Sequence, residues 1–530
     1  MKLSEALLCL VSIVLGGCSS GEKTTLTYPN GGDGLIADRD RDGAAAADSL
    51  DLAEYRFLGE SPEDYAGYWV ATAGDVDGDD LDDVLIGAYD ETGESGGAAY
   101  LILGKSLGAR GTRSLSRADH KFVGERAGDW AGFVVSHGNL DGDGLDDIVI
   151  GAYGCGDKGP ITGAVYVVLG RSLGEGGTFS LSKADYKLVG EGEDDYAGYA
   201  LTSEGDVDGD GLDDLLIGAS GQDAAGTNAG AGYLVLSSSL GSERTLDLAD
   251  ADYKFTGEAD DSWAGYSISY AGDVDGDGLD DLLLGADADD GGTESHVAYL
   301  ILGSSLGSRR TVPLAEADYK LVGETSYDYA SQVSGAGDVD GDGLDDIVIG
   351  AAGRDDHGYD SGGAYVVLGK SLGVPRTLDL SNADYRLLGE DAYDYAGSTV
   401  SDAGDVDGDG LGDILVGALK YDGRFDYQGA AYLVLGSSLG ERRTLELSQA
   451  CRMVGRFEGD HAGAAVSCAG DVDGDGLDDV VLGSYGGPDG NGAASIITAR
   501  AMAHMGSIDV IRKNSNDTGR LPQEGQRAPL

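Results

Sequence analysis

The 530-residue chain has few of the residues that stabilise small secreted folds or bind nucleic acid. It contains only 5 cysteines and 8 prolines, so a dense disulfide framework cannot be the basis of its stability. Lysine and arginine together number 35 against 95 aspartates and glutamates, which gives a formal net charge of −60. Because a nucleic-acid-binding surface must be basic, we exclude nucleic acid as a partner. So acidic a chain is suited to binding cations or basic partners.

The sequence also lacks an apolar run long enough to cross a bilayer as a mature helix. Its longest apolar stretch, 6–15, follows Lys2 and is typical of an export signal. The next residues read LGGC and resemble the lipobox of bacterial lipoproteins, which implies acylation of Cys18. We therefore expect a signal peptide at 1–18, a flexible tether at 19–48, and lipid anchoring in the bacterial cell envelope, at the outer membrane, facing the periplasm or the surface. Ordinary signal cleavage beside an incidental cysteine is the alternative.

The cysteines beyond this segment are Cys155, Cys451 and Cys468. They are odd in number and do not have the close spacing of metal ligands. In an oxidising compartment Cys451 and Cys468 could form one disulfide, and the sequence leaves this open.

An acidic ten-residue phrase recurs seven times, and successive copies are 64 to 67 residues apart. Most copies read GDVDGDGLDD, and the others differ from it at one or two positions. The copies begin at Gly74, Gly138, Gly205, Gly272, Gly337, Gly404 and Gly470. A period of this length indicates one repeat architecture rather than several unrelated domains.

Each repeat carries four short apolar runs around or after the acidic phrase. In the third repeat these are 199–203, 215–219, 232–236 and 253–256, rich in Val, Ile, Leu and Tyr and bounded by Gly and Asp. Such punctuation predicts β-strands, and no helix-length period of 3.6 residues competes with it. Four antiparallel strands in each of seven repeats predict an all-β fold, a seven-bladed β-propeller over 49–500. An open solenoid is the alternative.

The ends of the repeat region indicate how the ring closes. The seventh repeat has apolar runs at 480–484 and 493–498, but no fourth run follows them. An unpartnered copy of the fourth run, YRFLGE at 55–60, stands before the first acidic phrase. We expect this N-terminal strand to complete the last blade, which removes the open edge of a linear array. Residues 501–530 are polar and aperiodic, and we expect a disordered tail there.

The acidic phrase has the pattern of a calcium-binding loop. In the third repeat, carboxylates stand at positions 1, 3, 5 and 9 of the loop 206–214. Ca²⁺ takes six to eight oxygen ligands at about 2.3–2.6 Å, and a tight loop can turn alternate side chains inward to supply them. Leu212 at position 7 would offer its backbone carbonyl while its side chain joins the core, and the glycine at position 6 permits a positive φ. The predicted ligands of about seven Ca²⁺ sites are Asp75, Asp77, Asp79, Leu81, Asp83, Asn139, Asp141, Asp143, Leu145, Asp147, Asp206, Asp208, Asp210, Leu212, Asp214, Asp273, Asp275, Asp277, Leu279, Asp281, Asp338, Asp340, Asp342, Leu344, Asp346, Asp405, Asp407, Asp409, Leu411, Asp413, Asp471, Asp473, Asp475, Leu477 and Asp479.

These loops are not EF-hands, because position 12 is Ile217 rather than a bidentate glutamate. We expect Asp213 at position 8 to face solvent or cap a turn, since the sixth repeat has Gly412 there. Asn139 removes one charge from the second loop, and Asp80 replaces the position-6 glycine of the first, so both sites should be weaker. An acidic solvated turn is the alternative, although clustered carboxylates repel one another without a cation.

With these motifs the chain resembles the FG-GAP repeat family, which forms the propeller of integrin α subunits and of bacterial relatives. The matching residues of the third repeat are 197–199 for the FG element, 206–214 for the calcium loop and 218–219 for the GA of GAP. The resemblance covers residues 49–500. It implies a seven-bladed propeller with calcium loops on the lower face and ligand contacts on the upper face.

The chain departs from the family at the FG element, where most repeats have Ala in place of Phe. The residue before this position is Tyr65, Trp130, Tyr196, Trp263, Tyr329, Tyr395 or His461 in the successive repeats. In integrins, aromatic residues near this element help to seat the β subunit. A similar ring is one expectation here, and packing between blades is the other. We do not expect an integrin-like heterodimer, and we expect a monomer.

The upper face would be built from two sets of loops. One set, which includes 353–363, varies between repeats, and the other consists of 60–65 and its copies. Variable loops on a rigid ring suit recognition, so we expect binding or adhesion to a glycan or protein ligand, without catalytic residues. The histidines are scattered, and no GxSxG, HExxH or phosphate-binding loop occurs. A polysaccharide- or ester-cleaving propeller enzyme and a structural envelope protein are the alternatives.

Overall fold

The computed structural model describes residue 50 and residues 53–90, 95–289, 294–373, 376–440, 443–487 and 490–504. The predicted signal peptide, Cys18, the tether and residues 505–530 lie outside the described residues. Within the described part, no helix has the length and apolar character needed to cross a membrane.

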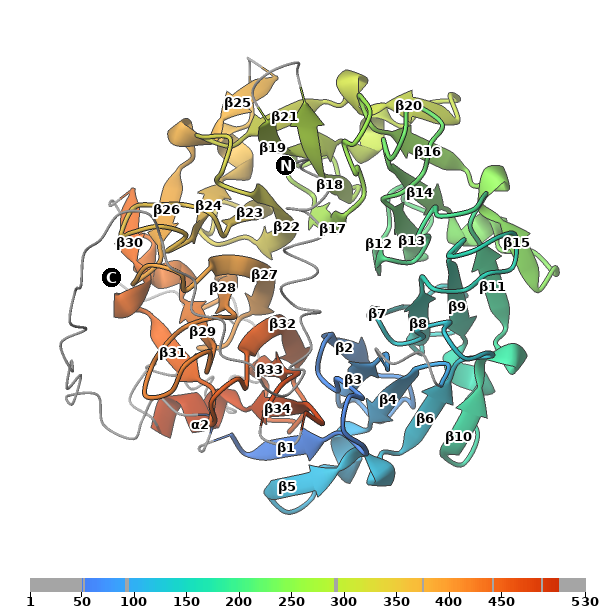
Figure 1. Ribbon diagram of the computed structural model, residues 1–530, viewed down its shortest axis with the longest axis horizontal. Coiled ribbons are helices and arrows are strands. Elements are labelled where there is room, and N and C mark those ends of the chain that lie inside the picture. Colours follow the sequence, from blue (N-terminus) through green and yellow to red (C-terminus); the bar gives the residue numbers. More distant parts are fainter. Residues whose placement is uncertain are drawn as a thin grey trace, which may run out of the picture. The chain divides into compact units, whose positions relative to one another are not determined.

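Seven blades of four antiparallel strands form a β-propeller (Figure 1), which confirms the predicted fold class. Each blade runs outward from the centre of the ring. The innermost strands are β2 (Val70–Gly74), β7 (Val135–Gly138), β12 (Ala200–Gly205), β17 (Ser267–Gly272), β22 (Ala330–Gly337), β27 (Ala396–Gly404) and β32 (Ala462–Gly470). The second strands are β3 (Asp83–Ala88), β8 (Asp147–Ala152), β13 (Asp214–Ala219), β18 (Asp281–Asp289), β23 (Asp346–Ala351), β28 (Asp413–Ala418) and β33 (Asp479–Ser484).

The outer half of each blade follows the same order. The third strands are β4 (Ala98–Ile102), β9 (Ala164–Val168), β14 (Ala231–Val235), β19 (Glu294–Ile301), β24 (Gly363–Val367), β29 (Ala430–Val434) and β34 (Ala493–Ile497). The fourth strands are β6 (His120–Val123), β11 (Tyr186–Val189), β16 (Tyr253–Thr256), β21 (Tyr319–Val322), β26 (Tyr385–Leu388), β31 (Cys451–Val454) and, in the seventh blade, β1 (Tyr55–Leu58). The strands predicted for the third repeat agree with these bounds to within two residues.

Six blades also carry a short fifth strand that the sequence pattern did not predict. It comes from the next blade along the chain and pairs in parallel with the fourth strand. These strands are β5 (Gly111–Ser114), β10 (Gly177–Ser180), β15 (Thr245–Asp247), β20 (Thr311–Pro313), β25 (Thr377–Asp379) and β30 (Thr444–Glu446). Because each one covers the outer edge of its neighbour, it links consecutive blades at the rim and blunts an exposed strand edge.

Short 3₁₀ helices flank these fifth strands. Those after the third strands are η2 (Gly104–Ser106), η4 (Gly170–Ser172), η6 (Ser237–Ser239), η8 (Gly303–Ser305), η10 (Gly369–Ser371) and η12 (Gly436–Ser438). Those after the fifth strands are η3 (Leu115–Arg117), η5 (Leu181–Lys183), η7 (Leu248–Asp250), η9 (Leu314–Glu316), η11 (Leu380–Asn382) and η13 (Leu447–Gln449). In the seventh blade the corresponding segment is the helix α2 (Ala499–His504).

The N-terminal strand closes the ring, as the sequence predicted. β1 pairs antiparallel with β34, with Tyr55 opposite Ile496 and Leu58 opposite Ala493. It also pairs in parallel with β5 of the first blade. The two ends of the repeat region therefore share one sheet, and the array has no free edge at this junction.

The core consists of layers between neighbouring blades. Every residue of the second strand β13 is buried, and so is every residue of the third strand β14. Alternate side chains of one strand enter the layers on its two sides, so both faces must be apolar. This explains why the second and third strands read as continuous apolar runs such as LLIGA rather than as alternating patterns.

A polar contact repeats between blades near the outer part of each layer. In the third blade, the Tyr233 hydroxyl donates to Glu191 at 3.0 Å, and Lys254 Nζ donates to the same carboxylate oxygen at 2.8 Å. Glu191 precedes the blade, whereas Tyr233 and Lys254 lie on its third and fourth strands. Comparable contacts recur around Glu60 and Glu390. Because these side chains lie on different blades, the contact fixes the angle between neighbours.

One expectation about the C-terminal part needs correction, and one open question is answered. Residues 501–504 belong to α2 rather than to a disordered tail, and Met502 is fully buried in a cluster with Leu50 and Met453. The remaining residues of the predicted tail lie outside the described part. Cys451 begins β31 and Cys468 lies on β32, and no disulfide joins them.

Candidate metal loops and candidate ligand face

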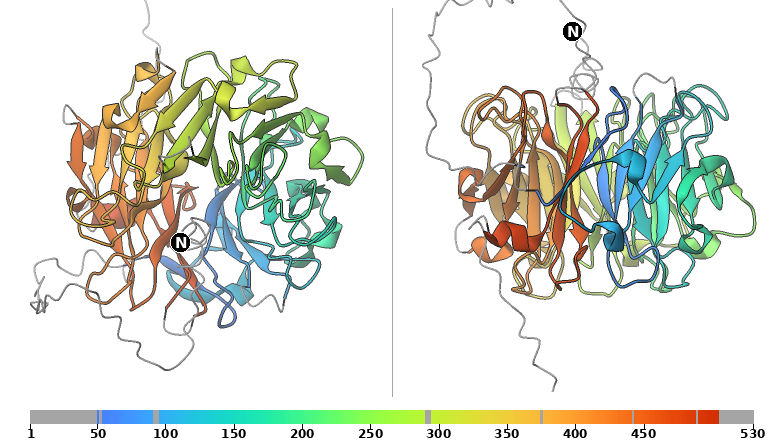
Figure 2. Two further views of the ribbon diagram at one scale, coloured as in Figure 1. Left: turned by 45° about the horizontal axis from the view of Figure 1, so that its top comes forward. Right: turned by 90° about the horizontal axis from the view of Figure 1, so that it is seen from below.

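All seven acidic loops connect the innermost strand of a blade to its second strand, so they lie at one edge of the sheets (Figure 2). We call this edge the acidic-loop face. The connections from second to third strand, and those from one blade to the next, lie at the opposite edge, which we call the variable-loop face. The alternating direction of the strands separates the two loop classes.

The carboxylate at position 1 organises the loops that have an aspartate there. Asp206 Oδ1 accepts hydrogen bonds from Gly209 N at 2.8 Å and Asp210 N at 3.1 Å, and its Oδ2 accepts one from Gly211 N at 2.8 Å. The same pattern recurs at Asp273. Position 1 therefore turns the loop back on itself, which brings the other carboxylates toward a common centre.

Backbone conformation and close packing both favour glycine at position 4. Gly209 adopts a φ of +74°, and a Cβ at this position would lie 3.0 Å from Leu279 Cδ2 of the next blade. Leu279 stands at position 7, which we expected to bury its side chain in the core. Instead, the position-7 leucine Leu212 is only half-buried, and its Cδ2 lies against Gly142 of the preceding loop.

The carboxylate at position 9 is buried at the start of the second strand. Asp214 Oδ2 accepts from Val207 N at 3.2 Å, and its Oδ1 accepts from Ser237 N at 2.9 Å. Burial raises the pKa of Asp214 to about 7, against the lowering effect of these two bonds, and the Asp208 and Asp206 carboxylates add to the rise. The pKa is raised to about 7 at Asp83, Asp147, Asp281 and Asp346, to about 8 at Asp413 and to about 9 at Asp479. A cation in the loop would reverse this penalty, because it favours the ionised form.

The loops bring the predicted ligands together. Carboxylate oxygens of three residues come within 4.8 Å of one another in the groups Asp75–Asp77–Asp79, Asp206–Asp208–Asp210, Asp273–Asp275–Asp281, Asp338–Asp340–Asp346 and Asp405–Asp407–Asp409. Buried oxygens of Asp77, Asp340 and Asn139 have no hydrogen-bond partner. Several converging oxygen donors, some of them buried without a partner, are the environment that a hard cation such as Ca²⁺ prefers.

Position 8 has a different role from the one predicted. Asp280 Oδ2 accepts a hydrogen bond from the backbone N of Asp206, in the preceding blade, at 2.8 Å. In return, the backbone N of Asp280 donates to Asp206 O at 3.1 Å. This reciprocal contact, the interloop clasp, recurs at Asp82, Asp146, Asp213, Asp345 and Asp478. At Gly412 only its backbone half remains, at 2.9 Å from Asp338 O.

Basic side chains contact only some of the loops. Lys105 of η2 pairs with Asp77 and Asp79, and Lys370 of η10 pairs with Asp340 and Asp342. Arg171 of η4 likewise pairs with Asp141 and Asp143 in the second loop. The corresponding residues of the third, fourth and sixth blades are Ser238, Ser304 and Ser437. The first loop, with Asp80 at position 6, and the second, with Asn139 at position 1, are therefore both among the loops that contact an internal cation.

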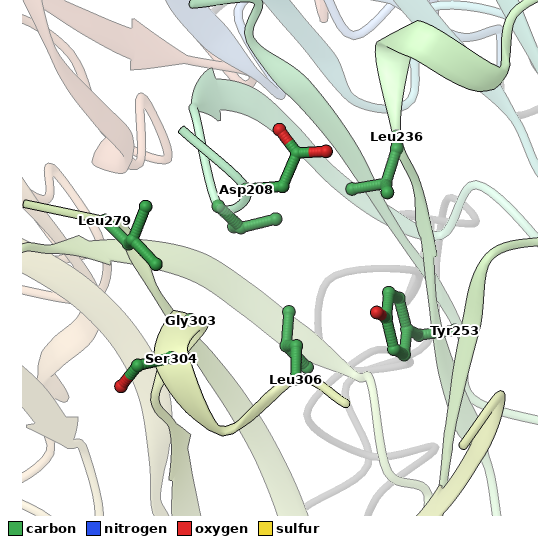
Figure 3. A pocket seen from close by; sticks show the side chains of 8 residues that line it. Asp208, Leu236, Tyr253, Leu279, Gly303, Ser304 and Leu306 are labelled. Carbon is green, nitrogen blue, oxygen red and sulfur yellow. The ribbon is translucent and has the colours of Figure 1, made fainter. Parts of the chain in front are cut away.

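A cavity of about 230 Å³ lies on the acidic-loop face between the third and fourth blades (Figure 3). It is lined mainly by aliphatic side chains, and Asp208 and Tyr253 also line it. Its leucines come from both blades, so it belongs to the seam between them and adds no new catalytic group.

The seven residues before the FG element share one conformation on the variable-loop face. Each is half-buried and adopts a φ between +50° and +59°, a range that non-glycine residues rarely enter. Tyr65 contacts both Tyr89 of the first blade and Tyr485 of the seventh, with ring centroids 5.8 and 6.0 Å apart. His461 stacks on Tyr485 at 4.9 Å. The side chains thus follow the ring and also pack between blades, which combines the two expectations.

The central channel contains one histidine–carboxylate pair. His137 on β7 and Glu204 on β12 replace alanines found in the other five repeats, and their Nδ1 and Oε1 atoms are 3.3 Å apart. Burial alone would lower the pKa of His137, but Glu204 raises it to about 9. Ser136 Oγ donates to Glu204 at 3.3 Å rather than to the imidazole, so these groups do not form a nucleophile–base pair.

Comparisons with known proteins bear on the same features. A family model described as FG-GAP repeat matches residues 197–235 and 329–367. Integrin alpha pat-2 of Caenorhabditis briggsae is 28% identical over 292 residues, which are 51% of this chain and 22% of that protein. Integrin alpha-V of Gallus gallus is 33% identical over 187 residues, or 32% of this chain and 16% of that protein.

A second class of relative is an enzyme. Phosphatidylinositol-glycan-specific phospholipase D of Bos taurus is 32% identical over 209 residues, which are 38% of this chain and 24% of the enzyme. This chain therefore spans less than a quarter of the length of these relatives. The crystal structure of the V. cholerae biofilm matrix protein Bap1 aligns with 84% of this chain at 10% identity, but the TM-score of 0.36 is too low to carry an argument.

Proposed function

We propose that the chain is an integrin-alpha-type propeller of the FG-GAP repeat family and that it is a calcium-stabilised extracytoplasmic module for binding or adhesion; its similarity to FG-GAP repeats and to integrin α subunits supports this. Its ligand is a glycan or a protein, bound on the variable-loop face. The observation that carries this proposal is the contrast between the two faces. The contacts of the acidic-loop face repeat from blade to blade, whereas connections such as 353–363 differ in sequence and in contacts.

The proposal assigns Ca²⁺ to the acidic loops. The carboxylates at positions 1, 3, 5 and 9 and the carbonyl at position 7 would hold the ion, with Asn139 at position 1 of the second loop. Bound Ca²⁺ supplies positive charge that offsets the repulsion between these carboxylates. The residues themselves hold the loops in shape through the position-1 hydrogen bonds and the interloop clasp. The role of the metal is therefore structural.

We further propose that Cys18 carries lipid and that the mature protein is a tethered monomer of the cell envelope. The sequence pattern that ends at Cys18 supports this part of the proposal. Mass spectrometry of the mature N-terminus tests it. An acylated Cys18 at residue one is the expected result, and an unmodified Cys18 contradicts it.

The binding proposal is tested on a combined glycan and protein array, probed with calcium and with a chelator. Residues 355–360 are then replaced by the equal-length segment 223–228 of another blade, which leaves the frame intact. We expect calcium-dependent binding of the parent protein and a changed binding profile of the variant at an unchanged melting temperature. An unchanged binding profile would show that the ligand does not bind this loop.

A propeller enzyme is the second candidate, and the phospholipase relatives together with the His137–Glu204 pair support it. Turnover of a polysaccharide, an ester or a glycosylphosphatidylinositol by the purified protein, abolished by Glu204→Gln, would replace binding by catalysis as the function.

A further inference from the structure

The exposed aromatic side chains of the described residues gather on one part of the variable-loop face. They are Tyr327 at 66% exposure, Tyr359 at 62%, Tyr393 at 57%, Tyr427 at 50%, Phe425 at 39% and Phe457 at 37%. We call these six residues the aromatic crescent. All six lie on loops between β21 and β32, that is, on connections of the fifth, sixth and seventh blades.

Backbone contacts hold these loops against one another. Tyr393 N donates to Tyr359 O at 2.8 Å, and the two phenol rings are 5.6 Å apart. Gly459 N donates to Asp426 O at 3.0 Å, which joins the loop of Tyr427 to the loop of Phe457. Gly353 N donates to Asp328 O at 3.0 Å and Lys420 N donates to Asp394 O at 3.3 Å, which join the loop of Tyr327 to that of Tyr359 and the loop of Tyr393 to that of Tyr427. The crescent is thus a continuous arc of paired loops rather than six unrelated side chains.

Two of the rings stand on strained backbone. Tyr393 has a φ of +71° and Tyr427 a φ of +53°, which are costly for bulky residues. At the position of Tyr393, four of the other repeats have a residue that tolerates this conformation better, and the remaining two have Glu63 and Tyr327. The four are Gly128, Asp194, Asp261 and Gly459. Because both rings are exposed, burial of apolar surface offsets little of this conformational cost. The tyrosines are therefore poorly explained by stability, and backbone strain of this kind is common at ligand-binding sites.

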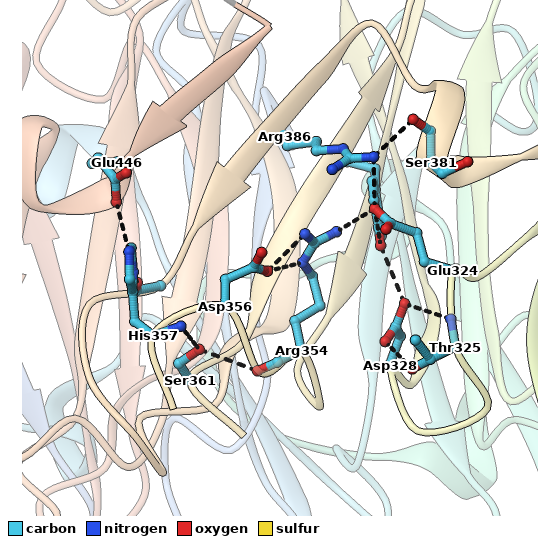
Figure 4. A network of polar contacts seen from close by, with 12 residues as sticks. Glu324, Thr325, Asp328, Arg354, Asp356, His357, Ser361, Ser381, Arg386 and Glu446 are labelled. Atoms are coloured by element: carbon cyan, nitrogen blue, oxygen red, sulfur yellow. Dashed lines mark hydrogen bonds and ion pairs between the residues drawn. The ribbon is translucent and has the colours of Figure 1, made fainter. Parts of the chain in front are cut away.

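Charged groups around the crescent already pair with one another (Figure 4). Arg354 contacts Glu324 at 3.1 Å and Asp356 at 2.7 Å. The His357 ring is 3.6 Å from Glu446. At the other end of the arc, the guanidinium groups of Arg56 and Arg456 lie 5.5 and 5.6 Å from the centre of the Phe457 ring. These groups form a balanced polar border beside the rings.

This combination favours one ligand chemistry. A sugar ring has apolar C–H faces, which stack on aromatic rings, and hydroxyl edges, which bond to carboxylates and guanidinium groups. The net charge of −60 repels a polyanion, and the paired border offers no strong charge to a polycation. The cores of protein interfaces are depleted in aspartate, whereas the crescent loops contain Asp355, Asp391 and Asp426. Rings on three consecutive blades suit a linear chain rather than a single sugar.

We propose that the aromatic crescent binds a neutral, linear polysaccharide, with sugar rings stacked on Tyr359, Tyr393 and Tyr427. This inference rests on the proposed function, because it names the ligand class and the part of the variable-loop face that binds it. Tyrosine suits this role, since its ring is large and has only two side-chain torsions to immobilise.

The test measures binding of the calcium-loaded protein to neutral oligosaccharides, namely a β-1,3-glucan, a β-1,4-mannan and an α-1,4-glucan, by calorimetry. We expect at least one to bind, and we expect Tyr359→Ala, Tyr393→Ala and Tyr427→Ala each to weaken it by about 2- to 10-fold. Tyr393→Gly should weaken binding while keeping or raising the melting temperature, because it relieves the strained φ. Asp261→Ala, at the same loop position of the fourth blade, is the control and should bind like the parent.

Each outcome decides the inference. If a neutral glycan binds and the three tyrosine variants do not weaken this binding, the crescent is not the binding site, although the protein remains a glycan-binding module. Calcium-dependent binding of a basic protein or a charged polysaccharide, with no neutral glycan bound, overturns the ligand class and leaves the proposed function standing. Absence of calcium-dependent binding to any of these probes contradicts both.

Discussion

At the scale of single residues, the carboxylate at loop position 8 decides how neighbouring acidic loops meet. Asp280 accepts from the backbone of Asp206 in the preceding blade, so it acts between loops rather than within one. Sequence spacing suggested a solvent-facing residue because Gly412 is tolerated in the sixth repeat. The structure explains this tolerance, since Gly412 N still donates to the preceding loop.

We expect Asp280→Ala to lower the free energy of unfolding by about 1–3 kcal/mol, because it leaves the Asp206 N–H without an acceptor. Asp280→Asn keeps an acceptor oxygen and should cost less. Exposed Asp250 on η7 provides the control, and Asp250→Ala should be neutral. Urea denaturation in saturating calcium measures all three variants. Equal midpoints for Asp280→Ala and Asp250→Ala would contradict the clasp.

A second prediction concerns pH and Asp394, which caps a loop of the variable-loop face by accepting from Asp391 N at 3.1 Å. Burial raises the pKa of this carboxyl to about 7. A folded-state pKa above the unfolded value, about 4, means that this group's stabilisation is present at low pH and is lost as pH rises toward 7. In the fourth blade, the neutral Ser262 hydroxyl accepts the equivalent bond at 2.9 Å.

Asp394→Ser should therefore gain stability relative to the parent as pH rises from 5 to 8. Thermal unfolding in excess calcium at each pH gives the difference in melting temperature between variant and parent. A difference that does not change with pH would show that Asp394 ionises in the folded state as easily as in the unfolded chain.

At the scale of elements, ring closure depends on β1. Tyr55 and Phe57 are buried on this strand, and β1 pairs with β34 on one side and β5 on the other. Its loss would expose two strand edges and remove two large side chains from the layer between the seventh and first blades. The short helix α2 packs with Leu50 in the neighbouring layer, between the sixth and seventh blades, so the packed part of the chain extends past the predicted boundary at residue 500.

Deleting residues 49–60 should lower the melting temperature by roughly 10 °C or more, from the loss of two buried aromatic residues and the strand pairing. Deleting 505–530 is the matched control and should change it little. Differential scanning fluorimetry in calcium measures both. Similar melting temperatures for the two truncations would argue against closure by β1.

The 3₁₀ helices that follow the third strands predict two classes of calcium site. Where η2, η4 and η10 present Lys105, Arg171 and Lys370 to the loop, the side-chain cation competes with Ca²⁺. One such charge near the site is worth about 1 kcal/mol, or roughly fivefold in affinity. Replacing all three residues with serine should raise the calcium affinity of these three sites by about this factor in a calcium titration, although Asn139 and Asp80 should keep the second and first sites below the rest.

Lys183→Ser, which removes an exposed charge from η5, is the control for this change in net charge. It should leave the weaker class in place. If the triple variant titrates like the parent, these basic side chains leave the loops at no measurable free-energy cost when Ca²⁺ binds.

At the scale of the whole molecule, we expect the seven acidic loops at one edge of the ring to make folding depend on metal. A ligand that binds only the folded state stabilises by about 2.7 kcal/mol per site at a hundredfold excess over Kd. Several sites would together rival the typical stability of a domain, about 5–15 kcal/mol. Without metal, each cluster must spread, protonate or unfold its loop.

Chelation should therefore lower the melting temperature sharply, and millimolar Ca²⁺ should restore it. Magnesium should substitute poorly, because it demands octahedral geometry and dehydrates reluctantly. Elemental analysis of the purified protein provides the independent readout. A chelated protein that melts at the same temperature and contains no metal would overturn the calcium assignment.

The sequence by itself determined the number of blades, the position of their strands, the closing strand and the candidate ligands of every loop. It could do so because these features depend on local patterns, such as apolar runs of strand length and carboxylates at fixed spacing, repeated seven times. Only the tertiary structure decided the fifth strands, the interloop clasp at Asp280, the half-buried place of Leu212 and the aromatic crescent around Tyr393. These features arise between segments that are distant in the sequence, where the ring geometry determines which side chains meet.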